Sequence, residues 1–291
     1  MRLNLFKIIL WIGLLVFGSH QSALADAPVW KVVKGDHHVY IGGTIHVLSK
    51  SDYPLPAPFE TAYNQSAKLI FETDTRKMQT PVFQAALMQK VVYSDGRNLK
   101  MVLNASTFQK LETHLTSRGI PITNFMKFKP GMVALTITII ELQRLGLMGT
   151  GVDEHFSLRA INDQKPVGQL ETVDEQLELI ATLGDGQENE IIAHTLKETK
   201  KLPAMMQTMK SAWRQGHSQA LENIILAPFK NDFPGVYKRV VINRNNAWLP
   251  KIEAMLKTKE VEFILVGALH LIGEDGVIAK LKDRGYTIQE P

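Results

Sequence analysis

Strand-like segments lie near the two ends of this chain, and a long helical stretch separates them. Short β-rich runs occupy 29–33, 38–41, 68–74, 262–266 and 286–289. A domain is built from packed layers around one core, so the runs from both ends are expected to join one sheet. The sequence therefore predicts an α/β or α+β fold whose central sheet carries a large helical middle section.

The middle of the chain has helical patterns, including 81–92, 106–118, 130–147, 174–183 and most of 188–257. Ser106 is a candidate N-cap, and interruptions are expected near Pro203, Pro228 and Pro234. The apolar run at 132–140 is followed at once by charged residues, so it is interpreted as a buried core helix and not as a membrane span.

Each half of the chain places one histidine and one acidic residue after a strand. Gly43-Thr44-Ile45-His46 and Gly267-Ala268-Leu269-His270 follow apolar strands, and Glu72 and Glu171 follow two others. We therefore expect two pseudo-symmetric halves that form the central sheet. They would bring these side chains to one edge, outside the strand carboxyl ends, where open α/β sheets bind ligands.

These side chains suit hydrolytic chemistry. Two neutral imidazoles with carboxylates can hold Zn²⁺, Mn²⁺, Fe²⁺ or Co²⁺, which lowers the pKa of a bound water. Without a metal, a His–Glu pair can act as general base and orienting acid. Arg244 could bind a carboxylate or an oxyanion. Simpler interpretations are hydrogen-bonded structural histidines at His46 and His270, helix capping by Glu72 and Glu171, and a surface ion pair at Arg244.

The composition and the absence of several motifs exclude a number of functional classes. The chain has no cysteine, which rules out disulfides, thiolate metal sites and cysteine nucleophiles. Its net charge of +4 is too small to indicate nucleic-acid binding. It contains no G-x-S-x-G, H-E-x-x-H, P-loop or G-x-G-x-x-G motif, so serine hydrolases, zincins, kinases and dinucleotide enzymes have no support.

The N-terminus has the pattern of a secretory signal peptide. A basic start precedes the apolar run 8–17, and Ala23-Leu24-Ala25 fits a cleavage site after Ala25. The alternative is an uncleaved membrane anchor, although the run is shorter than the roughly 20 residues that span a bilayer. We expect residues 1–25 to be a signal peptide, 26–291 a single domain, and the product to be a bacterial periplasmic or secreted protein without a further membrane span.

The ordered motifs resemble the TraB/GumN family, which is related to the Tiki proteases and, distantly, to erythromycin esterase and ChaN-like proteins. The resemblance covers nearly all of the chain after residue 25. It is carried by Val29-Trp30-Lys31-Val32, Gly43-Thr44-Ile45-His46-Val47, Phe71-Glu72-Thr73-Asp74, Gly151-Val152-Asp153, Gln169-Leu170-Glu171-Thr172 with Gln176, Arg244-Asn245, and Val266-Gly267-Ala268-Leu269-His270-Leu271 with Gly273.

The resemblance implies a metal-dependent protease that uses divalent ions such as Mn²⁺ or Co²⁺. By analogy His46, Glu72 and His270 would form the catalytic and metal centre, with Glu171 and Arg244 beside them. The leading hypothesis is an exported hydrolase, a peptidase that uses Mn²⁺, Co²⁺ or Zn²⁺ and acts on a peptide or small ester. The alternatives are a non-catalytic envelope protein that binds peptide, haem or metal, and a metal-free esterase.

Overall fold

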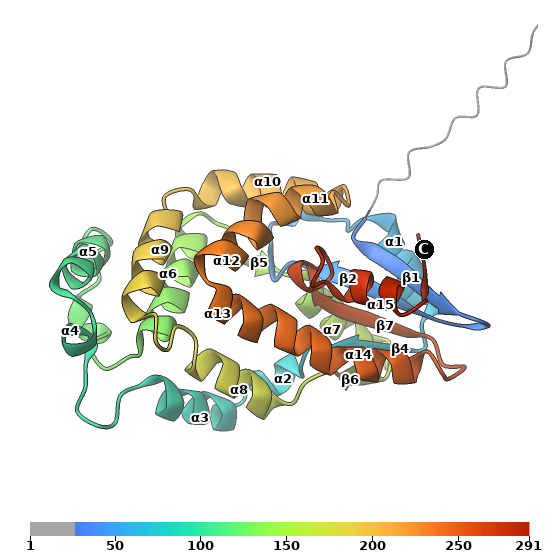
Figure 1. Cartoon of the computed structure of the whole chain (residues 1–291), viewed down its shortest axis with the longest axis horizontal. Helices are drawn as coiled ribbons and strands as arrows, with labels where there is room; N and C mark the ends of the chain where they lie inside the picture. The colour runs from blue at the N-terminus through green and yellow to red at the C-terminus, as the bar shows by residue number, and fades with distance from the viewer. Residues whose placement is uncertain (1–26, 291) are drawn as a thin grey trace, which may run out of the picture.

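The structure, a computed structural model, describes residues 27–290 (Figure 1). The expected signal peptide lies outside the described residues. A mixed sheet at the centre has the strand order β6-β4-β7-β2-β1-β8. The strands are β1 (Val29–Lys34), β2 (His37–Thr44), β4 (Lys68–Phe71), β6 (Val167–Gln169), β7 (Glu262–Gly267) and β8 (Thr287–Gln289).

The predicted α/β class is confirmed, and strands from both ends of the chain do join one sheet. Strands β6, β4, β7 and β2 are parallel, whereas β1 pairs antiparallel with β2 and with β8. Strand β7, from near the C-terminus, lies between β4 and β2. Strands from the two parts of the chain therefore interleave, and the four parallel strands all end at the same edge.

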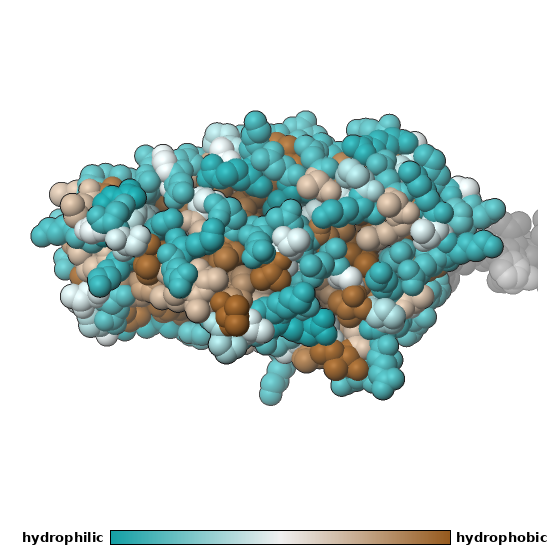
Figure 2. All heavy atoms as spheres, turned by 90° about the horizontal axis from the view of Figure 1, so that it is seen from below, coloured by the Kyte–Doolittle hydropathy of each residue, from teal (hydrophilic) through white to brown (hydrophobic). Residues whose placement is uncertain are grey.

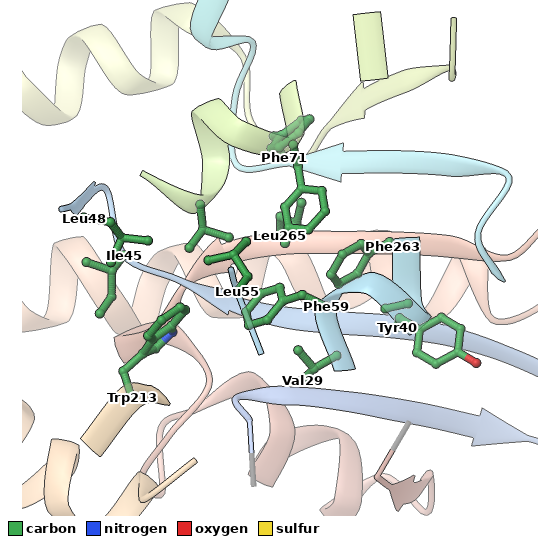
Figure 3. Packing of buried hydrophobic residues seen from close by; sticks show 14 of the residues in the cluster. Val29, Tyr40, Ile45, Leu48, Leu55, Phe59, Phe71, Trp213, Phe263 and Leu265 are labelled. Carbon is green, nitrogen blue, oxygen red and sulfur yellow. The ribbon is translucent and has the colours of Figure 1, made fainter. Parts of the chain in front are cut away.

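Alternating side chains on the sheet build two apolar layers. On β7, Phe263 and Leu265 join the core beneath α1 (Ala57–Gln65) and α7 (Val152–Asn162). Figure 3 shows Phe263 and Leu265 close to Phe59 of α1. Ile264 and Val266 point to the opposite core, which α14 (Arg244–Met255) and α15 (Val277–Asp283) cover. Burial of both faces explains the continuous apolar sequence of this central parallel strand.

The helical middle section has cores of its own, away from the sheet in Figure 1. Helices α4, α5, α6 and α9 pack around residues such as Leu111, Val133 and Ile192, and α3 packs on α8. The helices of this section and of the connection back to the sheet are α2 (Thr75–Met78), α3 (Pro81–Val91), α4 (Leu99–Val102), α5 (Ala105–Thr116), α6 (Pro130–Arg144), α8 (Val173–Ala181), α9 (Glu188–Glu198), α10 (Leu202–Arg214), α11 (Ser218–Leu221), α12 (Ala227–Asp232) and α13 (Pro234–Tyr237).

Two helix details differ from the sequence expectation. Helix α5 is capped by Asn104, whose side chain accepts the Thr107 N–H, and Ser106 lies inside its first turn. The predicted interruption near Pro228 is instead a π-helical segment, Glu222–Leu226, which leads directly into α12. A π-helical turn shifts the backbone hydrogen bonds by one residue. A proline, which has no N–H to donate to the previous turn, can therefore follow it.

Within residues 27–290, no helix combines the length and the apolar character that crossing a membrane requires. The apolar run at 132–140 lies in α6 and packs in the helical core, as expected. The face in Figure 2 is mainly hydrophilic, with apolar patches between polar residues. Exposed apolar side chains of this kind are normal on folded proteins.

Candidate functional site

The residues singled out from the sequence lie at the carboxyl edge of the four parallel strands. Thr44 of β2 is in register with Gly267 of β7, so the loops that carry His46 and His270 leave the sheet side by side. Phe71 of β4 pairs with Gln169 of β6, and the Glu171 N–H donates to the Glu72 carbonyl at 2.7 Å. The topology thus brings the two histidines and the two glutamates to one edge.

Arg244 is the centre of a buried polar cluster. Its Nε donates to Glu171 at 2.7 Å, and its Nη2 donates to Glu72 at 2.6 Å and to Glu171 at 3.0 Å. Its Nη1 donates to His270 Nε2 at 3.0 Å. One guanidinium therefore ties together residues that follow three different strands. Since these ion pairs are largely shielded from water, removing one partner would leave an uncompensated charge.

The helix that supplies Arg244 is aligned by an unusual backbone segment. A π-helical stretch, Lys238–Asn243, precedes α14, and Arg244 is the first residue of that helix. Trp248 follows one turn later, and its ring centroid lies 4.8 Å from Arg244 Cζ. The centroids of the Trp248 and His270 rings are 4.5 Å apart. π-Helical segments are rare and frequently occur at functional sites, where they change the direction of side chains.

His270 has a defined tautomer. Because arginine can only donate, His270 Nε2 must accept the Arg244 N–H, and Nδ1 must carry the proton. That Nδ1–H donates to Asn245 Oδ1 at 2.7 Å, while Asn245 Nδ2 donates to the carbonyls of His270 and Asp275. Burial lowers the pKa of His270 to about 4, and Arg244 acts in the same direction against the attraction of Glu72. The imidazole is therefore neutral at physiological pH.

Glu72 is held as a carboxylate. Its Oε1 accepts the Gly267 N–H at 2.7 Å, and its Oε2 accepts from Arg244. Burial opposes ionisation, but the charge of Arg244, helped by the Gly267 N–H, outweighs it and lowers the pKa of Glu72 to about 2. A Cβ at position 267 would lie 3.3 Å from Oε1, a tight contact with a carboxylate that its hydrogen bonds hold in place.

Glu171 is fixed from several sides as well. Besides Arg244, its Oε1 accepts the Trp248 indole N–H at 2.7 Å, and its Oε2 accepts from Gln176 of α8. Only 7% of Glu171 is exposed. The capping role considered for this segment belongs to the next residue, because Thr172 caps α8. A carboxylate with all these donors is suited to positioning Arg244.

His46 differs from the buried cluster because its side chain is 70% exposed. Its Nδ1 donates to Asp153 Oδ2 at 2.8 Å, and Asp153 is buried at the start of α7. The attraction of Asp153 raises the pKa of His46 above its usual value, although solvent around the ring screens part of that attraction. The other ring nitrogen, Nε2, faces away from Asp153, so the pair resembles a histidine oriented for proton transfer.

The structure joins Glu72, Glu171, Arg244 and His270 by direct contacts and places His46 on the loop beside them. Their catalytic roles stay predictions. Sequence reasoning gave no role to four further residues that position the cluster, although three of them belong to the ordered motifs. They are Asp153, Gln176, Asn245 and Trp248.

The arrangement does not fit a metal ion held by the predicted ligands. Within residues 27–290, no three His, Asp or Glu side chains are placed to hold one ion together. His270 Nε2 has a single lone pair, and Arg244 already donates to it. Glu72 Oε2 accepts from the same guanidinium. Two of the three predicted ligands are therefore bound to the protein's own cation.

A pocket of about 320 Å³ opens next to the cluster. Arg244 and Glu171 form part of its wall, and α8 and α14 supply most of the rest, including Leu179, Ala247 and Lys251. The pocket therefore borders the cluster on the side of these two helices.

Comparisons with known proteins match most of the chain. The chain is 27% identical over 250 residues to the protein YbaP of Escherichia coli (strain K12), which covers 85% of this chain and 89% of YbaP, and YbaP of Shigella flexneri matches equally. It is 22% identical over 319 residues to the metalloprotease TIKI1 of Danio rerio, covering 92% of this chain and 64% of that protein. No solved structure matches it.

A family profile matches almost all of the residues that the structure describes. The profile described as TraB/PrgY/gumN family matches residues 28–290, which include every strand of the central sheet and every residue of the cluster. The resemblance expected from the ordered motifs is thereby confirmed, and the chain belongs to the TraB/PrgY/gumN family.

Proposed function

We propose that this protein is a hydrolase that cleaves peptide bonds at the carboxyl edge of its sheet. One observation carries the proposal: an exposed His46–Asp153 pair stands beside a buried cluster in which Arg244 is held by Glu72, Glu171 and His270. A histidine that can transfer a proton and a positive charge that is held in place can together assist the attack of water on a carbonyl. The similarity to TIKI1, named a metalloprotease, supports a peptide substrate.

In this proposal His46 moves the proton. In the deprotonated imidazole, Nε2 accepts a proton from water as the water oxygen attacks the carbonyl carbon, and Asp153 stabilises the imidazolium that forms. Because Asp153 also raises the pKa of His46, this base form becomes more abundant as pH rises above neutrality. The same proton then passes to the leaving nitrogen when the carbon–nitrogen bond breaks. No proton is gained or lost over the cycle, and His46 returns to its starting form.

Arg244 stabilises the oxyanion in this proposal. An arginine has five N–H donors. Four of them bind Glu72, Glu171 and His270, which leaves one N–H on Nη1 for a substrate oxygen. Because the carboxylates fix the guanidinium before substrate arrives, little reorganisation is needed when the negative charge develops.

The test is cleavage of a peptide library, read by mass spectrometry, with wild type, His46→Ala, Asp153→Asn and the exposed control His217→Ala. Loss of a general base should lower the rate by about 10²–10⁴-fold in His46→Ala. We expect a smaller loss in Asp153→Asn and none in His217→Ala. Equal rates in wild type and His46→Ala would overturn the proposal, and peptide retention without cleavage would favour the binding-protein alternative.

A metal-dependent hydrolase is the second candidate. It is favoured by the hydrogen bonds of both histidines, because each donates its Nδ1–H to an oxygen, as metal-binding histidines do. His46, Glu72 and His270 would be the ligands of Mn²⁺, Co²⁺ or Zn²⁺. Cleavage that stops with a chelator and returns with one of these ions would favour this candidate over the first.

We propose in addition that the protein is exported and that residues 1–25 are removed. Strand β1 begins at Val29, so cleavage after Ala25 would leave the whole sheet intact. N-terminal sequencing of protein recovered from the periplasm should begin at Asp26. An intact N-terminus in the membrane fraction would instead identify an uncleaved anchor.

A further inference from the structure

The guanidinium of Arg244 lies where the predicted metal ligands converge. It donates to His270 Nε2 at 3.0 Å and to Glu72 Oε2 at 2.6 Å, two atoms that a divalent cation would need. The Arg244 side chain is only 12% exposed, and four hydrogen bonds hold it. An ion that used His270 would have to displace one of those N–H groups.

The charges of the cluster lead to the same conclusion. The carboxylates of Glu72 and Glu171, both paired with Arg244, contribute two negative charges, and Arg244 contributes one positive charge. His270 contributes none, because its Nε2 accepts from Arg244 and its Nδ1–H donates to Asn245. Without Arg244 the cluster would carry two uncompensated negative charges, which is the charge that one divalent cation neutralises. Buried carboxylates need a cationic partner, so either the guanidinium or a metal can satisfy them, and both together would leave excess positive charge.

We propose that Arg244 is a built-in cation that excludes divalent metal ions from His270 and Glu72, and that its removal converts the cluster into a transition-metal site. His46, on the loop beside His270, would complete that site. The inference concerns the same residues as the proposed function but rests on their contacts and charges alone. It predicts that the native protein has no tight metal site at this edge of the sheet.

The test is titration of the full-length protein with Co²⁺, followed by visible absorption, with metal content measured by mass spectrometry after dialysis. Wild type should show no stoichiometric binding, whereas Arg244→Met should bind one equivalent about 100-fold more tightly. The double variant Arg244→Met/His270→Ala should lose that gain. Stoichiometric Co²⁺ in wild type that disappears in His270→Ala would overturn the proposal, as would a folded Arg244→Met variant that binds no better than wild type.

A second variant and the addition of metal serve as controls for misfolding of Arg244→Met. Arg244→Met/Glu171→Gln has the same net charge in the cluster as wild type and keeps Glu72, His46 and His270. We expect it to fold without metal and to bind Co²⁺ more tightly than wild type. Arg244→Met should gain thermal stability when Co²⁺ is added, since a ligand of the folded state alone stabilises it. If neither variant folds with or without Co²⁺, a metal does not replace the guanidinium and the proposal fails.

This result is independent of hydrolysis. Failure of the metal prediction leaves the peptide-cleavage test of His46 intact, and failure of cleavage leaves the metal titration intact.

Discussion

Asn245 is the residue whose replacement best tests how the site is positioned. It is fully buried, and it makes three hydrogen bonds, accepting from His270 Nδ1 at 2.7 Å and donating to the carbonyls of His270 and Asp275 at 3.1 and 2.9 Å. Asn245→Leu keeps the approximate shape of the side chain and removes all three bonds. The His270 Nδ1–H and the two carbonyls would then lack partners in a buried environment.

The size of the effect follows from these three groups. Each unsatisfied buried group costs about 1–3 kcal/mol, and because neighbouring contributions are not additive we expect a loss of roughly 3–6 kcal/mol in the free energy of unfolding. That is a large share of the 5–15 kcal/mol typical of a folded domain. The loss of a group that orients a functional histidine should also lower the hydrolysis rate by about 10–100-fold.

The assay is urea denaturation, combined with ¹⁵N NMR of the His270 ring to identify its tautomer. The exposed neighbour Asn246 provides the control, and Asn246→Leu should change the free energy of unfolding by no more than about 0.5 kcal/mol. If Asn245→Leu costs less than about 1 kcal/mol, or if His270 in that variant moves its proton to Nε2 although Arg244 still donates there, the reasoning about these contacts is wrong.

Two further predictions concern the scaffold. A Cβ at Gly151 would lie 2.2 Å from the His46 carbonyl oxygen, so Gly151→Ala should lower the melting temperature and the hydrolysis rate, whereas Gly235→Ala, with no atom within 4 Å, should not lower either. Burial raises the pKa of Glu262 in the folded protein above its unfolded value of about 4.5. Glu262 therefore costs no stability below that value, and the free energy of unfolding falls as pH rises through the higher folded pKa. Glu262→Gln should therefore be more stable than wild type at pH 7, by about 1 kcal/mol in urea denaturation, with the difference shrinking toward pH 4; an equal difference at both pH values would contradict this cause.

The sequence was sufficient to predict the sheet and the edge at which the site lies. Apolar strand patterns located β2, β4 and β7, and glycine or acidic residues at their ends marked the loops that carry Glu72, His46 and His270. These are local signals, because strand length and side-chain alternation depend on neighbouring residues. The same signals predicted two halves in one sheet but could not show that β7 lies between β4 and β2.

The contacts within the cluster could not be predicted in this way. Arg244 contacts Glu72 and Glu171 because α14 packs on the sheet in one orientation. The packing of Trp248 and its apolar neighbours against the sheet determines that orientation. The π-helical segment before α14 changes the helical phase, and a 3.6-residue pattern does not reveal it. Asp153 lies 107 residues from its partner His46, so no spacing rule links them.

The proposed site contains its own cation, Arg244, and transfers protons through its own histidine, His46. The most direct measurement is the rate of peptide cleavage by protein stripped of metal with a chelator, with residual metal determined by mass spectrometry on the same sample. Because Arg244 already compensates Glu72 and Glu171, the account predicts that cleavage continues at the untreated rate when metal is far below one equivalent. Cleavage that disappears on chelation and returns with Mn²⁺, Co²⁺ or Zn²⁺ would contradict it.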